Sequence, residues 1–247
     1  MLSFLKKQKN SITTILPENF VDIHSHLLPG IDDGAKNLDD SVALIKRMYD
    51  FGIRNFITTP HIMEGVWENT PEIIMDKLND LRAHLNSLGM DIQLSTAAEY
   101  MLDGNFNNLL SQGNLLPLKD SYILVEMSYF NAPVNLYEIL FNIQIAGYTP
   151  ILAHPERYNF YHQNFNEYQK LKDAGCLFQV NLLSLSNYYG KHVNTIALKL
   201  LKENMIDLAG TDTHHHRHLN HLEKINDKKI LRLIQPVLEN NVTLFSR

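Results

Sequence analysis

Short, mostly apolar runs rich in β-branched residues recur along the chain and predict strands. They lie at residues 20–23, 55–59, 92–96, 122–125, 149–153, 177–181 and 206–209. This pattern is typical of strands that are covered on both faces of a parallel sheet.

The stretches between these runs have the period of an amphipathic helix. One predicted helical face carries Leu38, Val42, Ile45 and Tyr49. Asn37 before this face is a suitable N-cap, and Gly52 after it is a suitable stop. Another helix is predicted to open at Thr70-Pro71-Glu72. Further helices are predicted around 135–146, 165–174, 194–204 and 221–240.

Strand and helix therefore alternate about seven times, which predicts an α/β fold around a parallel sheet. The sheet is either a closed barrel or doubly wound, and the strand number and the length of 247 residues favour the barrel. The composition is even, without linkers or repeats. We expect one domain over residues 20–247, preceded by an N-terminal extension at 1–19.

Nearly every predicted strand is followed by an imidazole or a carboxylate. In chain order these candidates are His24, His26, Asp33, His61, Glu99, Glu126, His154, Asp212 and His214. The carboxyl ends of the strands share one face of a parallel barrel, where catalytic residues gather. The candidates are therefore predicted to form a single site.

The donor types in this set favour a metal centre. His24 and His26 are two residues apart, so on an extended chain they point to the same side, and Asp212 and His214 repeat this spacing. Nitrogen and oxygen donors without a thiolate suit Mn²⁺, iron or Zn²⁺. The set exceeds what one ion needs, so we expect at least two ions sharing a carboxylate, an arrangement typical of phosphoester hydrolysis. A lone His61 or His154 would more often be an ordinary histidine, but the joint pattern favours metal.

Composition and charge narrow the function further. Lys and Arg number 22 against 27 Asp and Glu, giving a net charge of −5 with no basic stripe, which disfavours nucleic acid as a partner. The single cysteine, Cys176, excludes an internal disulfide and favours a cytoplasmic protein. It opens a predicted strand, so we interpret it as a buried apolar residue. We expect neither a secretory signal nor a transmembrane segment.

Six motifs stand at the predicted strand ends: Asp22-Ile23-His24-Ser25-His26, Asp32-Asp33-Gly34, Thr59-Pro60-His61, Ala98-Glu99, Ala153-His154-Pro155-Glu156-Arg157-Tyr158 and Asp212-Thr213-His214. Together they resemble the PHP (polymerase and histidinol phosphatase) superfamily, and within it the CpsB/YwqE type of metal-dependent bacterial tyrosine-protein phosphatase. The resemblance runs from about Phe20 to the C-terminus. It implies a distorted (β/α)7 TIM-like barrel that holds two to three divalent ions, usually manganese, with iron or zinc as alternatives.

The resemblance also implies how the ligands are shared among the ions. By position, the first ion would be held by His24, His26, Glu99 and Asp212. A second would be held by Glu99, Glu126 and His154, with Glu99 bridging, and a third by Asp33, His61 and His214. Every one of these positions carries a competent ligand in this chain.

Arg157 matches the phosphate-binding arginine of this family, and its guanidinium offers a rigid fork of donors to a phosphate. The family's second arginine follows the Asp-x-His motif. Arg217 is the nearest candidate, but it stands about two residues too early, within a run of histidines at 214–218. The catalytic candidates are Arg157, Asp33, His61 and Arg217. The other histidines of the run are either a solvated loop, extra phosphate donors or an adventitious metal site.

The resemblance implies a protein-tyrosine phosphatase that hydrolyses phosphotyrosine through a metal-activated hydroxide, without a cysteine nucleophile. Its substrate would be a phosphotyrosine protein, by analogy a bacterial tyrosine autokinase that controls capsule or exopolysaccharide synthesis. The alternative is a PHP-type phosphatase of a small phosphomonoester such as histidinol phosphate. Side chains near the strand ends that are candidates to pack the substrate ring are Tyr100, Tyr129, Phe130 and Tyr158, although ordinary packing explains each of them as well.

Three other hypotheses are less favoured, two of them enzymes and one a protein without activity. An amidohydrolase would often carry a modified lysine where this chain has Glu126. A PHP exonuclease would need a basic groove. A metal-stabilised scaffold without activity would have no need of the complete ligand set or of Arg157.

Overall fold

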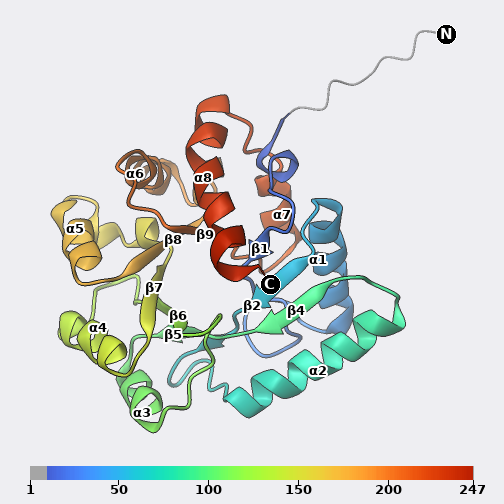
Figure 1. Cartoon of the computed structure of the whole chain (residues 1–247), viewed down its shortest axis with the longest axis horizontal. Coiled ribbons are helices and arrows are strands. Elements are labelled where there is room, and N and C mark those ends of the chain that lie inside the picture. Colours follow the sequence, from blue (N-terminus) through green and yellow to red (C-terminus); the bar gives the residue numbers. More distant parts are fainter. Residues whose placement is uncertain (1–9, 247) are drawn as a thin grey trace.

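The computed structural model of this chain describes residues 10–246 (Figure 1). Within this range the strands are β1 (Val21–Asp22), β2 (Asn55–Thr58), β3 (His61–Ile62), β4 (Gln93–Thr96), β5 (Glu99–Met101), β6 (Tyr122–Glu126), β7 (Thr149–Ala153), β8 (Leu177–Asn181) and β9 (Leu208–Gly210). All paired strands are parallel, in two sheets of order β1-β2-β4 and β3-β5-β6-β7-β8-β9. The predicted parallel α/β fold is confirmed.

The described residues form nine strands where seven were predicted, because the short strands β3 and β5 follow the predicted runs at 55–59 and 92–96 and lie outside them. Thr59-Pro60 separates β2 from β3, and Ala97-Ala98 separates β4 from β5. Proline has no N–H to give to a sheet, which explains the first break. The chain keeps its direction through both breaks, since the Thr59 N–H donates to the Ser25 carbonyl at 2.7 Å and the Glu99 N–H to the Pro60 carbonyl at 3.0 Å.

Backbone hydrogen bonds also connect the first and last strands. The Asp212 N–H donates to the His24 carbonyl at 2.7 Å, and the His26 N–H donates to the Thr213 carbonyl at 3.0 Å. The segments that follow β1 and β9 therefore lie side by side. The arrangement of strands departs from a regular barrel. Strand β4 pairs with β2 but not with β6, whereas β5 pairs with β6.

The helices lie around the outside of the strands (Figure 1). They are α1 (Leu38–Asp50), α2 (Pro71–Ser87), α3 (Gly104–Gln112), α4 (Leu136–Ile145), α5 (Asn166–Asp173), α6 (Lys191–Lys202), α7 (His216–Leu222) and α8 (Lys228–Phe245). Short 3-10 helices are η1 (Ile12–Thr14), η2 (Pro155–Arg157), η3 (Asn159–Tyr161) and η4 (Leu182–Ser186). The apolar faces of the α-helices pack on the outer face of the sheets and make the main core.

The predicted starts of α1 and α2 are confirmed by their caps. The Asn37 side chain accepts a hydrogen bond from the Asp40 N–H at 2.9 Å. Thr70 accepts one from the Ile73 N–H at 3.4 Å, and Pro71 occupies the first turn. These side chains satisfy backbone donors that have no partner within the helix.

One helix prediction is wrong, and one helix was not predicted. The stretch 221–240 is not one helix, because α7 ends at Leu222 and α8 begins at Lys228. Asp227 caps α8 by accepting from the N–H groups of Lys229 and Ile230 at 2.8 and 3.1 Å. Helix α3 was not predicted, since its only buried apolar side chains are Phe106 and Leu110.

Part of the predicted N-terminal extension packs on the domain. The Ile12 side chain is 1% exposed and belongs to the main core, and its N–H donates to the Ile225 carbonyl at 2.8 Å. Residues 1–9 of the extension lie outside the described residues. Among residues 10–246, no helix has both the length and the apolar character that a bilayer span requires.

Candidate metal centre

The predicted ligands come together at the carboxyl ends of the strands. His61 and Glu99 open β3 and β5, and Glu126 closes β6. The others lie in the segments that follow β1, β7 and β9. All members of the set fall into groups whose donor atoms lie within 4.8 Å of one another: His24, His26, Asp33, His61, Glu99, Glu126, His154, Asp212 and His214.

His24 and His26 show most directly that this cluster fits cations. Their Nε2 atoms lie 3.4 Å apart. On the far side of each ring, His24 Nδ1 is 2.7 Å from Gln179 Oε1, and His26 Nδ1 is 2.7 Å from Asp32 Oδ2. Because both acceptors hold a proton on Nδ1, the two Nε2 lone pairs face each other, and a cation between them removes the repulsion.

Two carboxylates complete this first group of donors. Asp212 Oδ1 is 3.4 Å from both Nε2 atoms. Glu99 Oε2 is 3.2 Å from the Nε2 of His24 and 3.5 Å from that of His26. Burial would raise the pKa of Asp212, but the His24 and His214 rings, when they are protonated in the absence of an ion, hold it well below its usual range. The group is therefore a buried nitrogen and oxygen set of the kind that binds Mn²⁺, iron or Zn²⁺.

A second group has buried atoms without hydrogen-bond partners. His61 Nδ1 lies 2.9 Å from Glu126 Oε1 and 3.1 Å from Glu99 Oε2. The directions of these contacts do not suit hydrogen bonds, and none of the three atoms has a hydrogen-bond partner within residues 10–246. Unpaired buried polar atoms destabilise a fold, so their convergence on one point fits an ion that binds all three.

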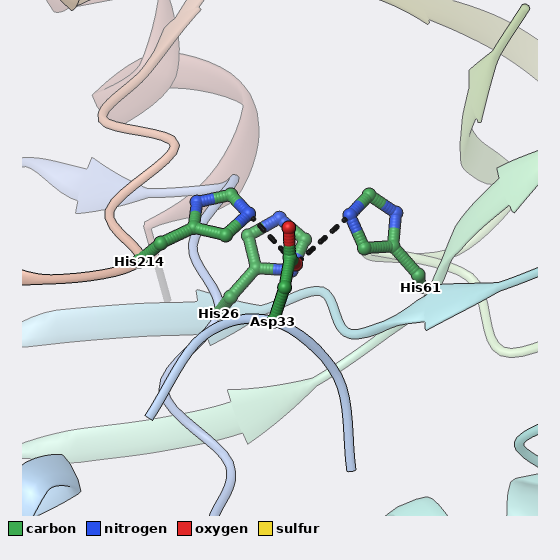
Figure 2. Close-up of side chains that lie close together, drawn as sticks. All are labelled: His26, Asp33, His61 and His214. Carbon is green, nitrogen blue, oxygen red and sulfur yellow. Dashed lines mark ion pairs between the residues drawn. The ribbon is translucent and has the colours of Figure 1, made fainter. Parts of the chain in front are cut away.

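The third group is drawn in Figure 2, where Asp33 lies between His61 and His214 and in front of His26 in this view. Asp33 Oδ1 is 3.1 Å from His214 Nε2 and 3.5 Å from His61 Nε2. Burial would raise the pKa of Asp33, but hydrogen bonds from His214 and His61 hold it well below its usual range. Asp33 is therefore ionised and can only accept, which suits a candidate metal ligand.

The groups differ from the predicted sharing, most clearly at Glu126. Glu126 was expected with His154, yet His154 Nε2 is 4.0 Å from Glu126 Oε2, whereas His61 Nδ1 is 2.9 Å from Glu126 Oε1. His154 instead lies with His24 and Glu99. Glu99 belongs to two of the groups, as expected of a bridging carboxylate.

The backbone around the cluster is constrained. His154 and Asp212 have φ of 37° and 48°, in the left-handed region that side chains disfavour. Strain of this kind persists where the surrounding structure imposes it, and it gathers at functional sites. At Gly34 the constraint is space and not the backbone φ. A Cβ at this position would lie 2.2 Å from the His26 carbonyl oxygen.

Arg157 lies beside the cluster, at the end of η2. Its NH1 donates to Asp212 Oδ2 at 3.0 Å, and its Cζ lies 4.6 Å from the ring centre of Tyr129 and 4.2 Å from that of Tyr189. Arg217 is not brought to the cleft. It is exposed on α7, with its Cζ 5.5 Å from the ring of Tyr188.

The cluster opens into a cleft of about 670 Å³. Of the aromatic candidates, Tyr129 and Phe130 line the cleft and are 43% and 92% exposed. Tyr100 and Tyr158 are fully buried, and their hydroxyls accept from the N–H groups of Leu116 and Met127. Ordinary packing therefore accounts for Tyr100 and Tyr158.

Within the histidine run, His215 and His218 also line the cleft. His218 Nδ1 is 3.0 Å from the Asp212 carbonyl, and its pKa is lowered to about 3 by burial and by the neighbouring histidines. A neutral His218 thus supports the backbone of a candidate ligand. The sequence did not predict Gln179 or Tyr189 as site residues, nor the contact of Asp32 with the His26 ring, because no local spacing marks them.

Known proteins resemble this chain over most of its length. Residues 20–230 match the family described as "Capsular polysaccharide synthesis, CpsB/CapC". Tyrosine-protein phosphatase YwqE of Bacillus subtilis is 31% identical to this chain. The match covers 78% of this chain and 77% of YwqE. Tyrosine-protein phosphatase CpsB of Streptococcus pneumoniae is 29% identical, over 78% and 82%.

Solved structures agree with these matches. A crystal structure from work on YwqE of B. subtilis and CpsB of S. pneumoniae, described as unique metal-dependent tyrosine phosphatases, superposes with a TM-score of 0.82 at 28% identity. It covers 91% of this chain and 94% of the solved one. A probable 2-pyrone-4,6-dicarboxylic acid hydrolase from Acinetobacter baumannii superposes at 0.50 with 13% identity, over 93% and 100%, and shares the fold alone.

Proposed function

This chain belongs to the CpsB/CapC family of capsular polysaccharide synthesis, and from that premise we propose that it is a metal-dependent protein-tyrosine phosphatase. The relatives YwqE and CpsB are named tyrosine-protein phosphatases, which supports this proposal. The support from this chain is a cleft that combines a cluster of metal-type ligands with an arginine.

One contact carries the proposal, the hydrogen bond of 3.0 Å between Arg157 NH1 and Asp212 Oδ2. Asp212 Oδ1 faces the Nε2 atoms of His24 and His26. The same carboxylate therefore touches both the ligand cluster and the guanidinium. A phosphate group held by Arg157 lies next to the cluster, as the hydrolysis of a phosphomonoester requires.

We propose two to three divalent ions, with manganese first and iron or zinc as alternatives. The ligands would be His24, His26, Glu99 and Asp212 for one ion and Asp33, His61 and His214 for another. A further ion would be held by Glu99 and Glu126, together with His154 or with His61, whose Nδ1 lies 2.9 Å from Glu126 Oε1. When bound, such ions lower the pKa of water toward neutrality and neutralise phosphoryl charge.

The side chains of this chain supply orientation and fixed charge. Arg157 presents a planar fork of donors that matches the oxygens of a phosphate. Asp33 stays ionised, because its pKa is held low, so it does not donate a proton to the leaving group. A tyrosine phenol, with a pKa of about 10, leaves more easily than an alkyl alcohol, so this reaction depends less on a general acid.

We further propose that the physiological substrate is a phosphotyrosine protein, a bacterial tyrosine autokinase of capsule or exopolysaccharide synthesis, and that the enzyme acts in the cytoplasm. The family description supports the link to capsule synthesis. The single buried cysteine supports the compartment.

The proposal is tested by presenting the manganese-loaded protein with a phosphotyrosine peptide and with histidinol phosphate in parallel. We expect turnover of the peptide with a kcat/KM at least about tenfold higher. Turnover of histidinol phosphate alone would support a small-molecule phosphatase instead, and turnover of neither would contradict both.

A further inference from the structure

Two tyrosines from different loops contact the guanidinium of Arg157. Tyr129 follows β6, and Tyr189 lies between η4 and α6. The distances of 4.6 and 4.2 Å from the Arg157 Cζ to the ring centres are within the range of cation–π attraction. The Arg157 side chain is only 20% exposed, and partial removal from water strengthens such contacts.

A single amide connects this pair of contacts to the ligand cluster. The Asn181 Nδ2 donates to Asp212 Oδ2 at 2.5 Å and to the Tyr189 hydroxyl at 3.1 Å. Asp212 Oδ2 also accepts from Arg157 NH1. The ring of Tyr189, the carboxylate of Asp212 and the guanidinium of Arg157 are therefore fixed relative to one another.

The remaining donors of Arg157 are free to bind a ligand. Within residues 10–246 its guanidinium makes one hydrogen bond, to Asp212, and the side chain lines the cleft. A long, unrestrained arginine would lose rotamer entropy when it bound an anion. An arginine that two rings already hold in place loses less, so it binds an anion more tightly.

We propose that Tyr129 and Tyr189 are positioning residues, which hold the Arg157 guanidinium so that its unpaired donors face a phosphate group in the cleft. The inference rests on the proposed function only in taking phosphate as the ligand of Arg157. Neither tyrosine is a fully buried core residue, since Tyr129 is 43% exposed and Tyr189 is half-buried at the edge of the main core. Both side chains line the cleft, which indicates a role toward it.

The test measures the affinity of manganese-loaded protein for inorganic phosphate by calorimetry. Tyr129→Leu and Tyr189→Leu are each expected to weaken phosphate binding about three- to thirtyfold, the range of a partly desolvated cation–π contact. Tyr129→Phe keeps the ring and is expected to stay within about twofold. The matched control is Phe141→Leu, which removes an exposed ring on α4 outside the cleft and leaves the contact between Tyr129 and Arg157 in place.

A second measurement asks whether Tyr129 acts through Arg157. In an Arg157→Ala background, Tyr129→Leu is expected to cause no further loss of phosphate affinity, because interacting residues are not additive. Metal content and thermal unfolding are measured for every variant, so that a misfolded protein is recognised. An equal loss in Tyr129→Phe and Tyr129→Leu would overturn the proposal. So would a further loss in the Arg157→Ala background, or a wild-type protein that binds no phosphate.

Hydrolysis of a phosphotyrosine peptide by the wild-type protein is followed separately. If the phosphate affinities follow the expected pattern while no peptide is hydrolysed, the positioning role stands and the proposed function fails. If the peptide is hydrolysed and the leucine variants bind phosphate as the wild type does, the proposed function stands and the positioning role fails.

Discussion

At the scale of single residues, the shape of Arg157 matters as much as its charge. A lysine keeps the charge but lacks the planar fork and stacks poorly on tyrosine rings. We expect Arg157→Lys to lower kcat/KM for a phosphotyrosine peptide about 10²- to 10³-fold, the usual effect of losing one preorganised donor to a transition state. Steady-state kinetics on protein of equal metal content check this, and a change within about twofold would contradict the role of Arg157.

Cys176 provides a second test at this scale. It lies just before β8, at the amino end of the strands, and is 1% exposed. Burial raises the pKa of its thiol to about 12, so the reactive thiolate is scarce up to pH 9. We expect Cys176→Ala to keep full phosphatase activity and iodoacetamide to leave the wild type active across pH 7–9. Loss of activity in either experiment would indicate cysteine chemistry.

At the scale of elements, the loop between β1 and α1 places Asp32 and Asp33 through the close approach of Gly34 to His26. A Cβ at position 34 would lie 2.2 Å from the His26 carbonyl oxygen and 2.4 Å from its Cβ. The loop would have to move and carry both aspartates with it. We expect Gly34→Ala to weaken manganese binding at least about tenfold, as loss of an outer-sphere partner does.

Manganese titration of the stripped protein measures this effect. Gly113→Ala is the matched control, because Gly113 ends α3 with φ of 67° and a Cβ there meets nothing within 4 Å. It introduces backbone strain without a collision near the site. Equal manganese affinities for the two variants would exclude the proposed role of Gly34.

Helix α8 is joined to two strands by one buried amide. Asn241 Oδ1 accepts from the Ala209 N–H at 3.0 Å, and its Nδ2 donates to the carbonyls of Ala209 and Val21 at 2.7 and 3.0 Å. Asn241→Ala leaves these groups unpaired, and we expect unfolding by urea to show a loss of about 3 kcal/mol. The control Asn240→Ala removes an exposed amide and is expected to change stability by less than about 0.5 kcal/mol.

The strands were predictable because burial on both faces leaves a compact apolar run, and their polar ends therefore stand out. The break between α7 and α8 was not predictable, because residues 223–227 contain neither glycine nor proline. Pro236, a residue type that usually marks a break, lies inside α8 instead. Asp227 caps α8, but an aspartate without a neighbouring glycine or proline does not by itself mark a helix boundary in the sequence.

At the scale of the whole molecule, the candidate centre depends on contacts between distant parts of the chain. The ligand candidates were visible because each follows its own strand. The side chains that orient them were not: Gln179 is 155 residues from His24, and Tyr189 meets Arg157 only after η2 and η4 are placed side by side on neighbouring strands. Spacing along the sequence therefore predicts the donors of such a site better than the groups that position them.

We propose that this ligand cluster makes the chain a metal-dependent phosphatase of phosphotyrosine. The most direct measurement removes metal from the purified protein, adds Mn²⁺ back in steps, and follows both bound metal and hydrolysis of a phosphotyrosine peptide, with His61→Ala as control. We predict that stripping abolishes turnover, that turnover returns as two to three ions bind, and that His61→Ala recovers little of it. Equal turnover without metal, or none in the fully loaded protein, would contradict the account.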